Sequence, residues 1–152
     1  MKKYLFVCLG NICRSPMAEA ILRHKSFEKK IAIVVDSAGT ANYHIGDKPD
    51  YRTLKILNEY GIQTNHRARQ INYKDLETFD LILAMDNQNL EHLYRMCQKN
   101  KSVIEKIRLA GDFHPKIKGI EVPDPYYGNL NDFRTVFNLL DDICTNLLNT
   151  NH

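Results

Sequence analysis

The sequence predicts one α/β domain over residues 1–152, in which a twisted, four-stranded parallel sheet has helices on both faces. Three observations lead to this fold class. Short apolar runs alternate along the chain with longer segments of helical periodicity. The runs are apolar at successive positions, which indicates strands covered on both faces, as in parallel sheets. A length of 152 residues, 43% of them hydrophobic and 26% charged, suits one domain with a substantial core.

Four segments are expected to form the strands of the sheet. Residues 3–7, 31–35 and 79–84 are short apolar runs rich in residues that favour strands. Residues 106–109 form a weaker fourth candidate. No repeat, low-complexity stretch or linker interrupts this order, so we expect a single domain.

The first two helices are expected over residues 16–27 and 49–60. Ser15 is a suitable N-cap for the first helix, because its side-chain oxygen can accept a hydrogen bond from the first turn. Pro16 then suits the first helical position. Gly61 is expected to end the second helix, since glycine readily adopts the left-handed conformation that often follows a helix.

Two further helices are expected over residues 87–97 and 130–148. Asp86 is a good N-cap for the former, and apolar residues recur at steps of three and four throughout the latter. Alternation of strands and helices implies right-handed crossovers and a doubly wound sheet. In such sheets ligands bind beyond the carboxyl ends of the strands, which points to residues 8–15, after the first strand.

The charge of the chain favours an anionic ligand but not nucleic acid. The net charge is +3, and the positive excess falls in the first half of the sequence. Dense basic runs are absent from the sequence, so no nucleic-acid partner is expected. No apolar stretch is long enough to cross a membrane or to form a secretory signal, so no membrane association is expected.

The cysteines indicate a reducing compartment. Cys8, Cys13, Cys97 and Cys144 are too few and too scattered for a disulfide scaffold, and no C-x-x-C pair suggests a zinc or redox motif. We therefore expect a cytoplasmic protein with one or two reactive thiols, although secretion without a signal stays open. Cys97 and Cys144 fall on the apolar stripes of helices and are expected in the core.

The most informative segment is VCLGNICRSP, residues 7–16. Five residues separate Cys8 from Arg14 at the junction of a strand and a helix. Such a loop can curl so that backbone N–H groups and the positive end of the helix dipole converge on one anion. Gly10 and Asn11 tolerate the left-handed backbone angles of a tight curl. The sequence therefore predicts a phosphate-binding loop after the first strand, made by Cys8, Leu9, Gly10, Asn11, Ile12, Cys13, Arg14 and Ser15.

Cys8 and Arg14 have the chemistry for attack on phosphorus. The positive surroundings of Cys8 favour its thiolate, and the planar guanidinium of Arg14 can hold two phosphate oxygens. The expected reaction forms a cysteinyl-phosphate that water later hydrolyses. Position alone leaves a second interpretation of Cys8 equally open, that of a small buried apolar residue.

Asp124 is the candidate for the proton donor that a leaving oxygen requires. Pro123 and Pro125 stiffen the backbone on each side, and the segment follows the fourth expected strand at the same edge of the sheet. The carboxyl could protonate the leaving group and then activate water. A simple turn-forming Asp-Pro is the alternative, and it stays open at this point.

Four segments together resemble the low-molecular-weight protein tyrosine phosphatases. The two strongest are CLGNICRSPMAE at residues 8–19 and DPYYG at residues 124–128. SAGT at residues 37–40 and HRARQ at residues 66–70 also resemble family segments, in the right order and at suitable spacing. The resemblance extends over essentially the whole chain, and the joint occurrence of the four segments is highly specific.

The resemblance implies roles for individual residues. Cys8 would be the nucleophile, Arg14 the phosphate clamp and Asp124 the general acid and base. The hydroxyl of Ser15 would donate to the Cys8 thiolate and improve it as a leaving group. The family pattern also implies that three residues brace the loop as structural support, namely Asn11, Ser37 and His66.

The resemblance also implies a substrate. Ile12 stands where a branch specific for phosphoarginine has threonine, so a protein containing phosphotyrosine is the expected partner. Aromatic walls would sandwich its phenyl ring, with Tyr126 and Tyr127 on one side. Tyr43 is the candidate for the other side, where many members have tryptophan, although an ordinary exposed tyrosine is an equally open interpretation. We expect a monomer with no cofactor and no metal.

Two other functions are possible for this chain, and the cysteines of the loop suggest that its activity is regulated by oxidation. The same scaffold serves arsenate reductases, which need further thiols that this chain lacks in a suitable pair, and a non-catalytic phosphoprotein-binding module is the second alternative. Cys8 and Cys13 lie five positions apart in one loop, a spacing from which a disulfide can form if the loop relaxes. We hypothesise that such a disulfide protects Cys8 from over-oxidation by peroxide.

Overall fold

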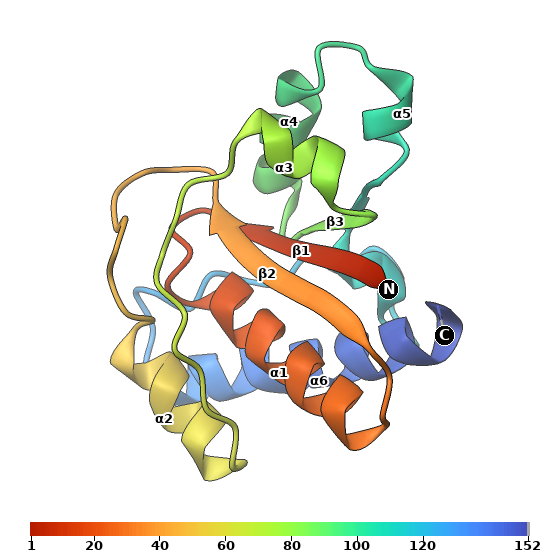
Figure 1. The fold of residues 1–152 in the computed structure, drawn as a ribbon. Helices are drawn as coiled ribbons and strands as arrows, with labels where there is room; N and C mark the ends of the chain where they lie inside the picture. Colours follow the sequence, from red (N-terminus) through yellow and green to blue (C-terminus); the bar gives the residue numbers. More distant parts are fainter. Residues whose placement is uncertain (152) are drawn as a thin grey trace.

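Four parallel strands form one sheet in the order β2-β1-β3-β4 (Figure 1). The description rests on a computed structural model and covers residues 1–151. All three strand pairs are parallel, as predicted. The strands are β1 (Lys2–Cys8), β2 (Ile33–Gly39), β3 (Leu81–Ala84) and β4 (Ile107–Leu109).

Helices cover both faces of the sheet. In Figure 1, α1 and α6 lie along one face with α2 beside them, and α3 and α4 lie on the other. The helices are α1 (Arg14–Glu28), α2 (Tyr51–Glu59), α3 (Tyr73–Thr78), α4 (Asn87–Met96), α5 (Lys101–Ile104) and α6 (Leu130–Asn151), with a short 3-10 helix η1 (Ala110–Phe113) after β4.

The side chains of β1 belong alternately to two hydrophobic cores. Tyr4 and Phe6 pack with α1 and α6, whereas Leu5 and Val7 pack on the opposite face with α3 and α4. All four are fully buried, which explains why the strand is apolar at successive positions. The predicted single-domain, doubly wound architecture is confirmed.

No helix within residues 1–151 is long and apolar enough to span a membrane.

The first predicted helix boundary is wrong by two residues. Helix α1 begins at Arg14, with Cys13 at the N-cap and no side-chain cap. Ser15 lies inside the first turn, where its hydroxyl is 2.9 Å from Cys8 Sγ and therefore does not cap the helix. The Pro16 ring is tolerated there because the first-turn N–H groups have no partner within the helix.

Other boundaries differ by a few residues. Strand β2 starts at Ile33 and continues to Gly39, because pairing with β1 extends through Cys8. Helix α2 begins after Asp50, whose carboxylate caps it, and Gly61 follows with a φ of 72°, as predicted. Helices α3 and α5 were not predicted, since each is too short to have a clear apolar period.

The order of the strands places the site. Strand β2 lies on one side of β1 and β3 on the other, so the connections after β1 and β3 leave the sheet in different directions. Cys8 is the last residue of β1, at the carboxyl end of this central strand. Next to it, a side chain at Gly39 would meet the Leu9 carbonyl oxygen at 2.7 Å, which accounts for glycine at the end of β2.

Candidate active site

The loop between β1 and α1 wraps around the sulfur of Cys8. The Asn11 amide N–H donates to Cys8 Sγ over 3.3 Å, and the Ser15 hydroxyl lies 2.9 Å from the same sulfur. Asn11 has a φ of 58°, as the predicted curl requires. Gly10, in contrast, does not have a positive φ, and its lack of a side chain instead leaves space for the His44 ring, 3.2 Å from where a Cβ would lie.

Asn11 is the centre of the bracing network that was expected around this loop. Its side-chain nitrogen donates to Ser15 Oγ over 2.8 Å and to Ser37 Oγ over 3.0 Å. Its side-chain oxygen lies 2.7 Å from His66 Nε2 and accepts from the Arg69 amide over 2.9 Å. These bonds hold the amide group in one orientation and offset the cost of its left-handed backbone.

Glu19 completes this network, and sequence reasoning missed it. Its carboxylate, 4% exposed, lies 3.1 Å from His66 Nδ1 and accepts from Ser37 Oγ over 2.7 Å and from Arg23 over 2.7 Å. Burial alone would raise the pKa of Glu19, but the hydrogen bonds and charges of these partners lower it. Asp36 places a third potential metal ligand near Glu19 and His66, all within 4.8 Å, but its carboxylate already binds Arg69, as that of Glu19 binds Arg23. The signal available in the sequence was a lone carboxylate within an otherwise apolar run, residues 17–22 of the expected helix.

Arg14 is buried and points into the pocket from the first turn of α1. Its Nη1 donates to Asp86 Oδ2 over 2.7 Å and to the Val122 carbonyl over 3.0 Å, while Nη2 lies 3.7 Å from Asp124 Oδ2. Burial alone would lower the pKa of Arg14, but the charges of Cys8, Asp86 and Asp124 outweigh it and raise the pKa. The guanidinium is therefore a permanent positive charge beside the sulfur.

Asp86 was predicted only as a helix cap, and the structure gives it a second contact. One carboxylate oxygen caps α4 by accepting from the Asn89 amide, and the other accepts from Arg14. Because the carboxylate is anchored to the start of α4, it fixes the direction of the guanidinium. The sequence contains the cap signal but nothing that relates it to Arg14, which lies 72 positions away.

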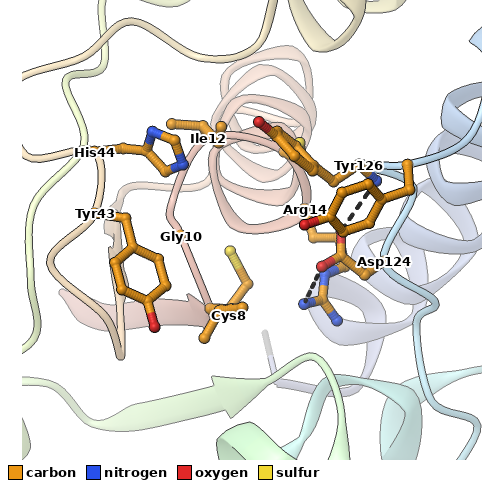
Figure 2. Close-up of a pocket in the computed structure, with 11 residues that line it drawn as sticks. Cys8, Gly10, Ile12, Arg14, Tyr43, His44, Asp124 and Tyr126 are labelled. Atoms are coloured by element: carbon orange, nitrogen blue, oxygen red, sulfur yellow. Dashed lines mark hydrogen bonds and ion pairs between the residues drawn. The ribbon is translucent and has the colours of Figure 1, made fainter.

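Asp124 lies at the rim of the pocket, on the segment between η1 and α6. Figure 2 shows its carboxyl beside the Arg14 guanidinium and facing the cavity that contains Cys8. One carboxylate oxygen accepts from the Tyr126 amide over 3.1 Å, and the side chain is 41% exposed. Access to water and to the cavity is what a group that exchanges protons needs.

The cavity has a volume of about 210 Å³, and both charged and aromatic side chains line it. Tyr43 and Tyr126 lie on opposite sides of Cys8 in Figure 2. Asn11 and Ser15 are buried and do not line the cavity. The lining residues are Cys8, Leu9, Gly10, Ile12, Cys13, Arg14, Tyr43, His44, Asp124, Tyr126 and Tyr127. His44 is the one member of this set that the sequence analysis did not single out.

A thiol at the carboxyl end of the central strand, enclosed by an anion-binding loop, defines a class, the cysteine-dependent phosphatases. The comparisons with known proteins agree. Residues 3–151 match the family model described as low molecular weight phosphotyrosine protein phosphatase. A human protein of that name is 45% identical over 153 residues, which cover 99% of this chain and 96% of the human one.

Solved structures give the same result. A protein tyrosine phosphatase from Entamoeba histolytica superposes with a TM-score of 0.93 at 41% identity, over 99% of this chain and 96% of the other. A drosophila arginine phosphatase superposes with a TM-score of 0.92 at 37% identity, over 99% of this chain and 97% of the other. This chain belongs to the low molecular weight phosphotyrosine protein phosphatase family, a family of hydrolases.

Proposed function

We propose that this chain hydrolyses phosphotyrosine in proteins through a cysteinyl-phosphate, with Cys8 as nucleophile, Arg14 as phosphate clamp and Asp124 as acid and base. The observation that supports this most strongly is the enclosure of Cys8 Sγ, which receives a hydrogen bond from the Asn11 amide and lies 2.9 Å from the Ser15 hydroxyl. Both contacts can stabilise the negative charge that the sulfur carries when it acts as a nucleophile. The charge of Arg14 acts in the same direction.

In the first step, the Cys8 thiolate attacks phosphorus and the bond between phosphorus and the tyrosine oxygen breaks. The new bond is Sγ–P, and Asp124 gives its proton to the departing phenolate, so that neutral tyrosine leaves. The guanidinium of Arg14 and the loop N–H groups hold the equatorial oxygens throughout. The contacts of Arg14 with Asp86 and Val122 keep it in place before substrate arrives.

In the second step, water replaces the sulfur on phosphorus. Asp124, now a carboxylate, takes a proton from the attacking water while the O–P bond forms and the Sγ–P bond breaks. Inorganic phosphate and the Cys8 thiolate are the products, and Asp124 is again protonated. The Ser15 hydroxyl can donate to the sulfur as its charge returns, which makes the thiolate a better leaving group.

Phosphotyrosine is the proposed substrate because the walls of the cavity suit a flat aromatic ring. Tyr43 and Tyr126 face the space above Cys8 from two sides, and Ile12 adds an apolar surface. A phosphorylated serine is too short to fill this space and still reach the sulfur. Phosphoarginine would place a charged guanidinium against Ile12, where it finds no hydrogen-bond acceptor on that side chain.

A set of matched phosphopeptides tests the substrate. We expect kcat/KM for the phosphotyrosine peptide to exceed that for the phosphoserine or phosphoarginine peptide by at least about 100-fold, because the former is too short for the cavity and the latter leaves its guanidinium unpaired beside Ile12. Ile12→Thr should shift the ratio toward phosphoarginine. Ile12→Val should not, because valine has the shape of threonine but lacks its hydroxyl. Equal rates on phosphotyrosine and phosphoarginine would contradict the assignment.

We also propose that Cys13 protects Cys8 by forming a disulfide with it. Burial, together with the charges of Asp50 and Cys8, raises the pKa of Cys13, so peroxide should react first with Cys8. Cys8 becomes a sulfenic acid, and Cys13 then attacks its sulfur and releases water. Dithiothreitol reduces the resulting disulfide to two thiols.

The measurement is the activity that dithiothreitol restores after peroxide treatment. Wild type should regain most of its activity, whereas Cys13→Ser should regain several-fold less, because its sulfenic acid is oxidised further. Cys144→Ser removes a buried thiol from the core between α1 and α6 and should behave as wild type. Equal recovery of wild type and Cys13→Ser would exclude the protective disulfide.

We further propose that the protein is a cytosolic monomer and that it needs no cofactor. Every proposed catalytic group comes from one chain, and all four cysteines are free thiols, as a reducing compartment would keep them. Arsenate reduction is less well supported, because that reaction needs further accessible thiols that carry a disulfide from the pocket to the surface. Cys97 and Cys144 are fully buried in separate cores on opposite faces of the sheet.

A further inference from the structure

Arg52 joins two segments that form the active site without lining the cavity itself. It lies in the first turn of α2, and its Nε and Nη2 each donate to the Asp50 carboxylate over 2.9 Å. Nη1 also donates to the Gly128 carbonyl over 2.9 Å, and Nη2 to the Tyr126 carbonyl over 3.0 Å. One guanidinium therefore binds a helix cap and the segment that contains Asp124.

The same turn of α2 holds the loop around Cys8. The Asp50 amide donates to the Ile12 carbonyl over 2.8 Å, and the Thr53 hydroxyl donates to the Cys13 carbonyl over 3.3 Å. A trans peptide directs its N–H opposite to its C=O. Because both carbonyls are turned toward α2, the N–H groups of the same two peptides, those of Cys13 and Arg14, are turned away from it.

Residues 124–128 have few other attachments. Within this segment the Tyr126 amide bonds to Asp124 and the Gly128 amide to the Pro125 carbonyl, and neither bond fixes the segment to the rest of the protein. Among residues 1–151, the hydrogen bonds that join it to another segment are the two from Arg52. The ion pair of Asp124 with Arg14 is longer, at 3.7 Å.

We infer that Arg52 is a positioning residue that sets where Asp124 lies relative to Cys8; the inference rests on the proposed function of both. The guanidinium is well suited to this, because it lies over the Phe133 ring with 4.3 Å to the ring centroid and has a side chain only 17% exposed. Its planar fork makes four contacts at once. A lysine has a single nitrogen and cannot reach the carboxylate and both carbonyls together.

The test compares Arg52→Met with Arg134→Met, a matched control. Arg134 also pairs with a carboxylate, Glu59 at 2.6 Å, and joins α6 to α2, but neither residue lines the cavity. We expect Arg52→Met to lower kcat for aryl phosphates roughly 10- to 100-fold, since small displacements of catalytic groups have effects of that size. Inhibition by inorganic phosphate should change by less than about threefold, because the loop that binds the anion keeps its own contacts. Arg134→Met should match wild type in both.

A double-mutant comparison separates positioning from a general structural role. If Arg52 acts through Asp124, then adding Arg52→Met to Asp124→Asn should lower kcat no further. A loss of the same factor in both backgrounds would overturn the inference, as would wild-type kcat in the single variant. Arg52→Lys should show an intermediate loss, and it serves as the test if the methionine variant does not fold. Failure of the proposed function itself would look different, since wild type would then show no turnover that depends on Asp124.

Discussion

Replacing Cys8 with serine should abolish turnover of p-nitrophenyl phosphate. We expect a loss of at least about 10⁴-fold, the scale seen when a covalent nucleophile is removed. A serine hydroxyl stays protonated at neutral pH, and among residues 1–151 no general base lies within hydrogen-bond distance of the sulfur, whose side-chain partner is the Ser15 hydroxyl. The anion-binding loop and Arg14 remain, so Cys8→Ser should still bind a phosphotyrosine peptide.

The measurement is steady-state hydrolysis in the presence of EDTA, together with mass spectrometry of enzyme quenched during turnover. Wild type should be insensitive to EDTA and should yield a phosphorylated adduct at Cys8, and Cys8→Ser should yield none. Cys97→Ser is a matched control, because this buried thiol donates to the Leu93 carbonyl over 3.1 Å, a bond that serine retains. Full activity in Cys8→Ser would favour the non-catalytic binding module and contradict a covalent mechanism.

Replacing Asp124 with asparagine should slow hydrolysis by about 10²–10⁴-fold, the usual contribution of a positioned acid. Asparagine has the same shape and can still accept from the Tyr126 amide, but it cannot give a proton to the leaving oxygen or take one from water. The loss should be largest for phenols that leave poorly as anions. A series of aryl phosphates, each measured with wild type and variant, provides this comparison.

Asp132→Asn is the control for the loss of a carboxylate from the same part of the protein. Asp132 lies in the first turn of α6 and accepts from the Asn129 amide, but it does not line the cavity that contains Cys8. It should leave kcat unchanged. A small effect of Asp124→Asn that is equal for all leaving groups would mean that another group protonates the phenol.

Much of this fold and site could be predicted because the signals are local. Strand β1 is apolar at successive positions because both of its faces are buried, and that pattern is legible without a structure. The position of Cys8 at the end of that strand, with five residues between it and Arg14, predicted the loop. Asp124 between two prolines marked the second segment, and its carboxyl does face the cavity.

The errors arose where one side chain could serve two purposes. Ser15 has a residue type that suits a helix cap, yet its hydroxyl faces Cys8, because the helix begins earlier and turns that side chain inward. Short elements such as α3 and α5 escaped prediction for a different reason. A helix of one or two turns has too few residues for a period to be distinguished from chance.

Local patterns in the chain were enough to predict the alternation of strands and helices, the loop around Cys8 and the candidate acid at Asp124. These depend on backbone preferences and burial, which neighbouring residues express within a few positions. Three contacts became visible only in the tertiary structure. Asp86 orients Arg14, Glu19 supports the bracing network, and Arg52 joins α2 to residues 124–128, the segment that contains Asp124. Each of these contacts joins residues brought together by the crossovers of the sheet, and the energies that select them have no local pattern in the chain.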